Sequence, residues 1–329
     1  DAAAWYRQGM IAWALTARAY APNPPRSLDP TRLGRLADTS LRIAAQIEPQ
    51  NVYYRIAVGR FLLASGAAIT RFAAGGHFEG ALDVARKGGD AMTHAEAAVE
   101  LGRVAWRRYD TFVNRRVETV PGSAVRSLST ALNPQIPGQD AMDGPQLPLK
   151  AVREIIEAGS FPLPAEFSGD AYYREADNLF REAYAAAPTN ARTFRSVAMV
   201  IAEKNHWKDL EDFSRAHLRQ VPWDSWGWMV LGLAMQRQGN SKPGAAAFDS
   251  AMALVDPRER ARLDRLDRVL PSADSARQMR ASDPARAAFG RLYWLLADPL
   301  WSREGNESRV EYLARVTFAE LRWTIDDMG

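Results

Sequence analysis

The stretch Asp224–Pro257, DSWGWMVLGLAMQRQGNSKPGAAAFDSAMALVDP, predicts one helix, a tight turn and a second helix that folds back on the first. Gly239 ends the first helix, and Phe248 and Ala251 fall on one face of the second. Pro257 closes the unit, because proline has no N–H and its ring clashes with the preceding turn. The stretch therefore predicts a helical hairpin.

The first helix of this hairpin carries Trp228, Leu231 and Gly232 at the spacing W-x2-L-G. The unit resembles a tetratricopeptide (TPR) repeat, a helical hairpin with a period of about 34 residues. Met235 stands where that pattern prefers Tyr, and Gly244 where it prefers Ala. Met can fill an irregular gap and Gly allows helices to approach closely, so each departure has a physical substitute.

Helix-stopping prolines recur at this period. Pro188, Pro222 and Pro257 follow the apolar segments REAYAAA, AHLRQV and SAMALVD, so the last unit is preceded by another of similar length. The preceding unit keeps a helical face and a second-helix start at Phe194, Val197, Ala198 and Trp207. The regular stops predict an all-α chain, a TPR-like helical-hairpin array or α-solenoid, with TPR-like repeats over residues 168–257.

Composition sets outer limits on the protein class. The chain has 329 residues, of which 47% are hydrophobic and 25% charged, as in ordinary soluble proteins. No stretch approaches about 18 uninterrupted apolar residues, so no membrane span is predicted. The absence of cysteine excludes disulfides and thiolate chemistry. The sequence starts at Asp1 with neither a Met nor a leader, which predicts a processed or trimmed product from which a signal peptide has been removed. We therefore expect an exported or periplasmic protein, with a cytoplasmic location as the alternative.

The net charge of +3 argues against nucleic acid as a partner. Asp and Glu are interleaved with Arg nearly everywhere, whereas nucleic-acid binders concentrate basic residues on one surface. The Arg-rich segment 106–116 is the one stretch that favours the opposite view. The charged segment 258–291 is interpreted as solvated helices, the first of them over 258–270, with Arg262 paired to Glu259 or Asp267.

The rest of the chain divides by helix pattern and by proline. Residues 1–118 predict helical hairpins of weak TPR character, with helices over 1–20, 31–47, 53–65, 78–87 and 92–113. Residues 119–167 hold seven of the 19 prolines and predict an irregular arm or linker, broken by a short helix at 149–158. Residues 258–329 form a C-terminal helical segment. The arm either lies on the repeats or clasps a partner.

The C-terminal segment has a more specific resemblance. It rests on Tyr293-Trp294, on ADPL at 297–300, on GNE at 305–307, on Arg309 and on YLAR at 312–315. The segment resembles the helical region before the motif in bacterial GWxTD-domain proteins, a family that combines such helices with TPR-like repeats. The resemblance implies no assigned activity. The sequence stops at Gly329 before any Gly-Trp-x-Thr-Asp motif, which predicts either a cut or a lost end.

The C-terminal segment also has a predicted helix cap and helix face that do not depend on the family resemblance. Asn306 is predicted to cap the helix that starts at Glu307, whose Tyr312, Val316, Ala319 and Trp323 share one face. The aromatic side chains of the segment are interpreted as core packing rather than as a binding site.

No catalytic constellation is apparent. His77, His94, His206 and His217 lack the paired spacing of zinc ligands, and the last two are interpreted as surface or capping residues. H-E-x-x-H, G-x-S-x-G and phosphate-loop motifs are absent, and the pairs at 75–76 and 88–89 are interpreted as turn glycines. We therefore expect no enzyme, no cofactor and no metal site.

The candidate site is instead a surface. By resemblance to TPR domains, the first helices of the hairpins line a groove of residue types that anchor proteins. The predicted groove consists of Arg192, Arg195, Met199, Trp226, Met229, Leu233, Gln236 and Arg237. At least one of Trp223, Trp226 and Trp228 should be exposed or covered by another segment, because together they span too much of a helix.

These observations favour a non-enzymatic scaffold that binds other proteins. The expected role is an accessory or structural subunit of a larger, membrane-associated assembly. The alternative is an enzyme-linked domain whose active part lies beyond Gly329 or in the Pro-rich region.

Overall fold

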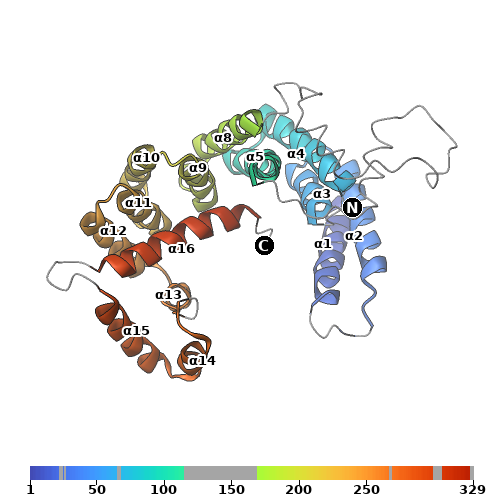
Figure 1. The fold of residues 1–329 in the computed structure, drawn as a ribbon. Helices are drawn as coiled ribbons and strands as arrows, with labels where there is room; N and C mark the ends of the chain where they lie inside the picture. The colour runs from blue at the N-terminus through green and yellow to red at the C-terminus, as the bar shows by residue number, and fades with distance from the viewer. Residues whose placement is uncertain are drawn as a thin grey trace, which may run out of the picture. The chain divides into compact units, whose positions relative to one another are not determined.

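The described part of the chain is all-α. The computed structural model describes residues 1–21, 25, 27–64, 68–114, 169–266, 269–298 and 306–326, and no described residue forms a strand (Figure 1). The chain divides into two compact units, one of Asp1–Gly88 with Glu100–Asn178, the other of Gly89–Val99 with Leu179–Gly329. The predicted Pro-rich arm, with its short helix, lies outside the described residues. None of the described helices is long and apolar enough to cross a membrane.

The first unit is built from helical hairpins. Its first four helices are α1 (Ala2–Ala19), α2 (Pro30–Ile47), α3 (Val52–Ala64) and α4 (Ala68–Gly88). α1 packs on α2 and α3 packs on α4. The next helices, α5 (Ala91–Asn114) and α8 (Gly169–Ala186), supply residues to both units.

The second unit continues the pattern and adds the C-terminal helices. Its two hairpins are α9 (Ala191–Glu203) with α10 (Trp207–Gln220), and α11 (Ser225–Arg237) with α12 (Ser241–Leu254). These are followed by α13 (Pro257–Leu263), α14 (Ser272–Arg280), α15 (Asp283–Ala297) and α16 (Glu307–Asp326). α11 packs on α9, α10 and α12, so the hairpins form a TPR-like array.

Three of the described hairpins have the same close contact, which α9–α10 lacks because α9 contains no glycine. A glycine on the first helix faces a large apolar side chain on the second, at such short range that a Cβ on Gly232 would lie 2.9 Å from the Phe248 ring. Gly59 stands in the same relation to Phe78, and Gly9 to Leu41, in the other unit. Glycine permits this close approach because it has no side chain. The same glycine contact in three hairpins independently supports a repeated helical-hairpin unit.

The predicted turns of the repeats are confirmed. Gly239 has a φ of +81°, and the N–H of Asn240 donates to the carbonyl of Met235 at 2.9 Å, which satisfies the end of α11. α8, α10 and α12 each end shortly before one of the three spaced prolines. Pro257 does more than stop a helix, because it also occupies the first turn of α13, where no N–H is needed.

Two predictions about where helices begin and end are wrong. Gly75 and Gly76 were interpreted as turn residues, but they lie inside α4. That helix buries Ala74, Phe78 and Leu82 at four-residue spacing. Burial of an apolar face outweighs the cost of a helical glycine, about 1 kcal/mol each.

The second wrong prediction is a continuous helix over 258–270. α13 ends at Leu263, and the hydroxyl of Tyr312 donates to the carbonyl of Arg265 at 2.7 Å and to that of Leu263 at 3.4 Å. A carbonyl held by a side chain of another helix is less available to continue its own helix.

Candidate functional site

The candidate site is the face that α9 and α11 present to α16, here called the first-helix face. α16 contacts α9, α11 and α12, and Figure 1 shows it running along these helices. Its buried residues follow helical spacing: Val310, Leu313, Ala314, Thr317 and Leu321. The first-helix face is therefore occupied by a helix of the same chain.

The apolar face predicted for α16 lies beside the face that is buried in the structure. Tyr312, Val316 and Ala319 are half-buried, while Leu313 and Thr317 are fully buried. The predicted cap is confirmed, because Asn306 Oδ1 accepts from the N–H of Arg309 at 2.8 Å.

Three of the eight predicted groove residues are buried. Met199 and Met229 are each 1% exposed, and Leu233 is 0% exposed. Side chains so buried are not available as exposed anchors while α16 lies on this face. Their role in binding another protein stays a prediction.

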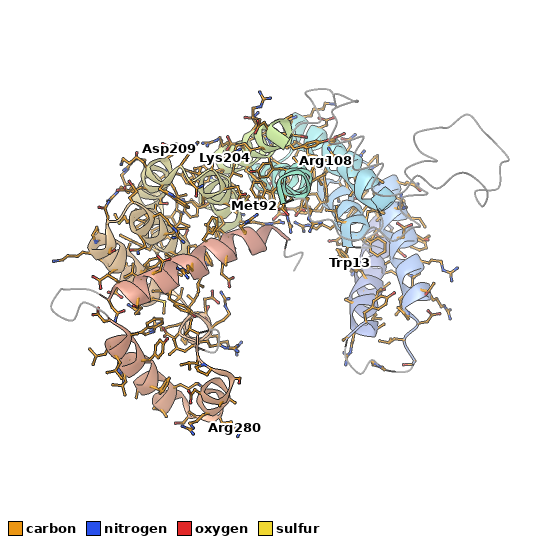
Figure 2. All side chains as sticks on the ribbon, in the orientation of Figure 1. Trp13, Met92, Arg108, Lys204, Asp209 and Arg280 are labelled. Atoms are coloured by element: carbon orange, nitrogen blue, oxygen red, sulfur yellow. The ribbon has the colours of Figure 1, made fainter. Side chains whose placement is uncertain are left out.

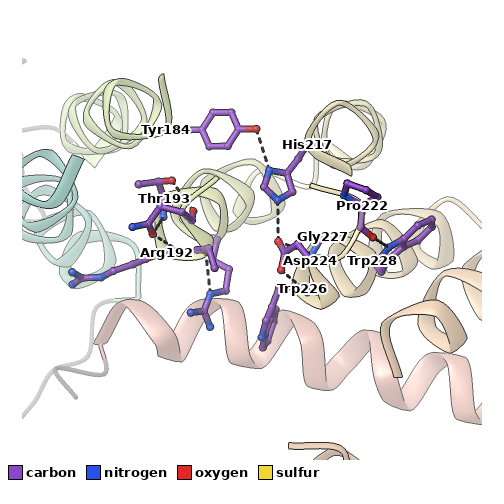
Figure 3. Close-up of polar contacts among 12 residues, drawn as sticks. Tyr184, Arg192, Thr193, His217, Pro222, Asp224, Trp226, Gly227 and Trp228 are labelled. Carbon is purple, nitrogen blue, oxygen red and sulfur yellow. Dashed lines mark hydrogen bonds and ion pairs between the residues drawn. The ribbon is translucent and has the colours of Figure 1, made fainter. Parts of the chain in front are cut away.

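Arg195 and Trp226 form a pair between the two first helices. The Arg195 guanidinium carbon lies 5.1 Å from the centroid of the Trp226 ring, a cation–π contact. Both residues are half-buried, and Figure 3 shows the Trp226 side chain directed toward α16. Burial lowers the pKa of Arg195, and the nearby Asp224 opposes that shift. The pair places a cation and a large ring side by side on the first-helix face.

The remaining groove residues form ion pairs and hydrogen bonds. Arg192 pairs with Glu96 of α5 at 3.3 Å, within the second unit. Gln236 Nε2 donates to Glu311 Oε2 at 3.3 Å, and Arg237 pairs with Glu311 Oε1 at 3.5 Å. Glu311 belongs to α16, so two of the predicted groove residues hold the helix that occupies the face.

Glu311 is tuned by this environment. Burial raises the pKa of its carboxyl, but hydrogen bonds from Arg315 and Gln236 together with the charges of Arg237 and Arg315 outweigh burial, and the net shift is downward. The carboxylate is thus favoured in its charged form where it meets Gln236 and Arg237.

Further contacts fix α16 along its length. Arg262 of α13 pairs with Glu320 at 2.6 Å, and Arg322 pairs with Glu203 of α9 at 3.6 Å. The rings of Trp207 and Phe318 meet edge to face at 6.2 Å. These partners could not be predicted from the sequence pattern, because they lie far apart along the chain.

His217 corrects a sequence prediction. It was interpreted as a surface or capping residue, but it is 1% exposed. Its Nε2 lies 2.9 Å from Asp224 Oδ2, and its Nδ1 lies 3.2 Å from the Tyr184 hydroxyl (Figure 3). The ring stacks on Phe194 at 4.0 Å. Three hairpin elements, α8, α10 and the start of α11, thus share one buried polar network.

The same network positions the start of α11. Asp224 caps this helix by accepting from the N–H of Trp226 at 3.1 Å and from that of Gly227 at 3.2 Å. Trp228 Nε1 donates to the carbonyl of Pro222 at 2.9 Å. Of the three tryptophans near this cap, Trp223 is 69% exposed, as the sequence required of at least one. The cap therefore sets the direction in which Trp226 leaves the helix.

Other described residues offer no metal chemistry. No group of three or more His, Cys, Asp or Glu side chains that could hold a metal ion occurs among the residues the structure describes. Met92 of α5, labelled in Figure 2, accepts a hydrogen bond at 3.2 Å from Asn190, the residue that caps α9.

Comparison with known proteins adds a likeness to solved structures. No family model matches the chain, and no curated protein matches it. The chain is similar to a crystal structure of a tetratricopeptide repeat protein from Parabacteroides merdae ATCC 43184, with 13% identity and a TM-score of 0.28. That match covers 94% of this chain and 99% of the other. A TM-score of this size carries no argument, so the fold class rests on the helices described above.

Proposed function

We propose that the chain is a non-enzymatic scaffold that binds other proteins, and that the first-helix face is its docking surface. The observation that supports this is α16 itself, an amphipathic helix seated on α9 and α11. A face that accepts a helix of the same chain has the shape and the side chains to accept a similar helix from a partner, which is a common mode of peptide recognition.

The chemistry of the expected partner follows from α16. An incoming helix needs small and aliphatic residues where α16 has Leu313, Ala314 and Thr317, and a carboxylate where it has Glu311. Gln236 and Arg237 would receive that carboxylate, and the Arg195–Trp226 pair would flank the helix. In this proposal a partner helix binds by taking the place of α16.

The test uses the sequence of α16 as a labelled peptide. A fluorescein-labelled peptide of residues 307–326 is titrated with the full chain carrying Leu313→Asp, which places a charge at a position 2% exposed and releases the chain's own helix. Fluorescence anisotropy should show saturable binding, weaker with the unaltered chain, whose face is occupied. Trp226→Ala or Arg195→Glu in the receiving chain should each weaken binding about tenfold.

The controls separate binding from unfolding. The same peptide carrying Leu313→Asp should not bind, and circular dichroism should show that the receiving chain keeps its helices. A receiving chain that stays helical but never binds the peptide would rule out the first-helix face as a docking surface.

We also propose the finer identity that the sequence indicates. The chain would be a member of the bacterial GWxTD-domain family and an accessory subunit of a membrane-associated assembly on the exported side. In support, several residues that carry this resemblance meet at the joint of α15 and α16: Asn306 donates to the carbonyl of Trp294 at 2.5 Å, and the Trp294 and Tyr312 rings lie 5.2 Å apart. Fractionation of the source cells tests the compartment, since recovery with the cytoplasmic proteins would contradict it.

A further inference from the structure

A large cavity lies among the C-terminal helices, and no residue of α9 or α11 lines it. It has a volume of about 1050 Å³ and is lined by residues of α13 and the two residues that follow it, by residues of α15, and by the start of α16. This volume is at the upper end of the range for ligand sites, about 300–1,000 Å³.

The lining is strongly cationic. Seven arginines contribute to it: Arg258, Arg260, Arg262, Arg265, Arg286, Arg291 and Arg309. Asp264 is the one acidic residue, and none is lysine, among the described residues that line it. Arginine rather than lysine suits the bidentate recognition of carboxylate or phosphate, because the guanidinium is a planar fork of donors.

Part of this lining is held by the protein itself. Arg262 pairs with Glu259 and with Glu320, each at 2.6 Å, and Arg309 pairs with Asp249 at 2.8 Å. The hydrogen bonds between Arg262 and Glu259 lower the pKa of the Glu259 carboxyl. These arginines therefore fix the walls of the cavity.

Two other arginines are differently placed. Within the part of the chain that the structure describes, the side chains of Arg258 on α13 and Arg291 on α15 have no ion pair and no hydrogen bond. They line one cavity from two helices, so two uncompensated positive charges are available to a ligand. An acidic group entering the cavity would meet both.

The cavity is bordered by exposed apolar side chains. Leu295, which lines it, is 63% exposed, and Leu292 and Leu296 on the same helix are 52% and 62% exposed. A free inorganic anion would need the arginines but not the leucines. The combination favours a ligand that carries carboxylates and apolar side chains together, as a peptide does.

Two other classes of ligand fit less well. Nucleic acid would need an aromatic face for stacking, but Trp294, the one aromatic in the described lining, packs against Tyr293 and Tyr312 at 5.0 and 5.2 Å. A bilayer is flat, whereas these arginines line a concave space between helices.

We propose that this cavity binds an acidic, leucine-containing segment of a partner protein. Its carboxylates pair with Arg258 and Arg291, and its apolar side chains cover Leu292 and Leu295. Because the site uses none of the residues of the first-helix face, it does not rest on the function proposed for that face.

The test compares two peptides that differ only in charge. Fluorescein-labelled EDLLEDLLEDLL and its neutral counterpart QNLLQNLLQNLL are titrated with the full chain, and anisotropy is recorded at low and at high salt. We expect the acidic peptide to bind at least tenfold more tightly at low salt, with a loss of affinity at high salt. Arg258→Glu and Arg291→Glu should each weaken binding about tenfold, and Leu295→Ser several-fold.

Control variants make the result specific to the cavity. Arg219→Glu reverses an exposed charge on α10 outside the lining and should leave binding unchanged. Trp226→Ala, which alters the first-helix face, should also leave it unchanged, so that failure of one proposal is distinguishable from failure of the other. Equal affinity for both peptides, or no effect of Arg258→Glu and Arg291→Glu, would overturn the proposal. Tighter binding to oligouridine or to phosphatidylserine vesicles than to the acidic peptide would overturn it as well.

Discussion

The hairpin α11–α12 and the helix α15 contain similar apolar residues, but these are buried in the hairpin and exposed on α15. Phe248 on α12 is 0% exposed and Leu231 on α11 is 3% exposed. Phe289 and Leu295 on α15 are 40% and 63% exposed. In the hairpin Gly232 lies directly opposite the Phe248 ring, whereas α15 has few neighbours among the described helices.

This difference shows what apolar periodicity means in each region. In the repeats, apolar periodicity marks residues that pack inside their own hairpin, where Gly232 lets the Phe248 ring approach the backbone. On α15 the same residue types are left on the surface, beside a cavity lined with arginines. Large apolar residues that stay exposed within the described part of the chain favour an interaction surface.

The largest expected effect comes from one aromatic residue in each region. Phe248→Ala should lower the free energy of unfolding by about 3–5 kcal/mol, because it leaves a cavity in a closely packed hairpin. Phe289→Ala should change it by less than about 1 kcal/mol, because that side chain is already 40% exposed. Urea unfolding followed by circular dichroism measures both, and equal losses would remove the contrast between the regions.

Two glycines should give changes of opposite sign. Gly232→Ala should destabilise by about 1–3 kcal/mol, since its Cβ would overlap the Phe248 ring. Gly290 on α15 has no atom within 4 Å of the Cβ position, so Gly290→Ala should stabilise by about 0.5–1 kcal/mol through its helix propensity. Thermal midpoints of the two variants give the signs directly. A stabilising Gly232→Ala would contradict this close contact.

The smallest expected effect is the contribution of Glu311 to stability at acidic pH. The pKa of Glu311 is lowered from its ordinary value of 4.5, so its contribution to stability is complete above that pH and is lost as the pH falls through the lowered value. Glu311→Gln should therefore cost a few tenths of a kcal/mol at pH 7, as for a partly exposed pair, and reduce the loss of stability on acidification. Thermal midpoints at pH 7 and pH 3.5 measure this, and identical differences for both proteins would contradict it.

The repeats were predictable because their signals are local. The proline stops, the W-x2-L-G spacing and the left-handed Gly239 all act within a few turns of helix. The helices of residues 1–118 followed from the same kind of pattern, except where burial of Phe78 carried α4 through two glycines.

The candidate site was only partly predictable. Gln236 and Glu311 are 75 residues apart, and apolar spacing tells which face of a helix is buried but not which helix it meets. For the same reason the predicted groove residues were correctly placed on the first helices while the helix that occupies them was not foreseen. The arginines of α13 are exposed, as expected, but their convergence with those of α15 and α16 depends on tertiary packing.

The central claim is that α16 lies on the first-helix face, and a cross-linking measurement tests it most directly. The chain has no cysteine, so Gln236→Cys with Glu311→Cys introduces the only two thiols, at side chains now 3.3 Å apart. A short bismaleimide should join them within one chain, as detected by mass spectrometry of the digest, and should fail to join Arg219→Cys with Glu311→Cys. Equal cross-linking of both pairs, or none of the first pair in a folded chain, would contradict the account.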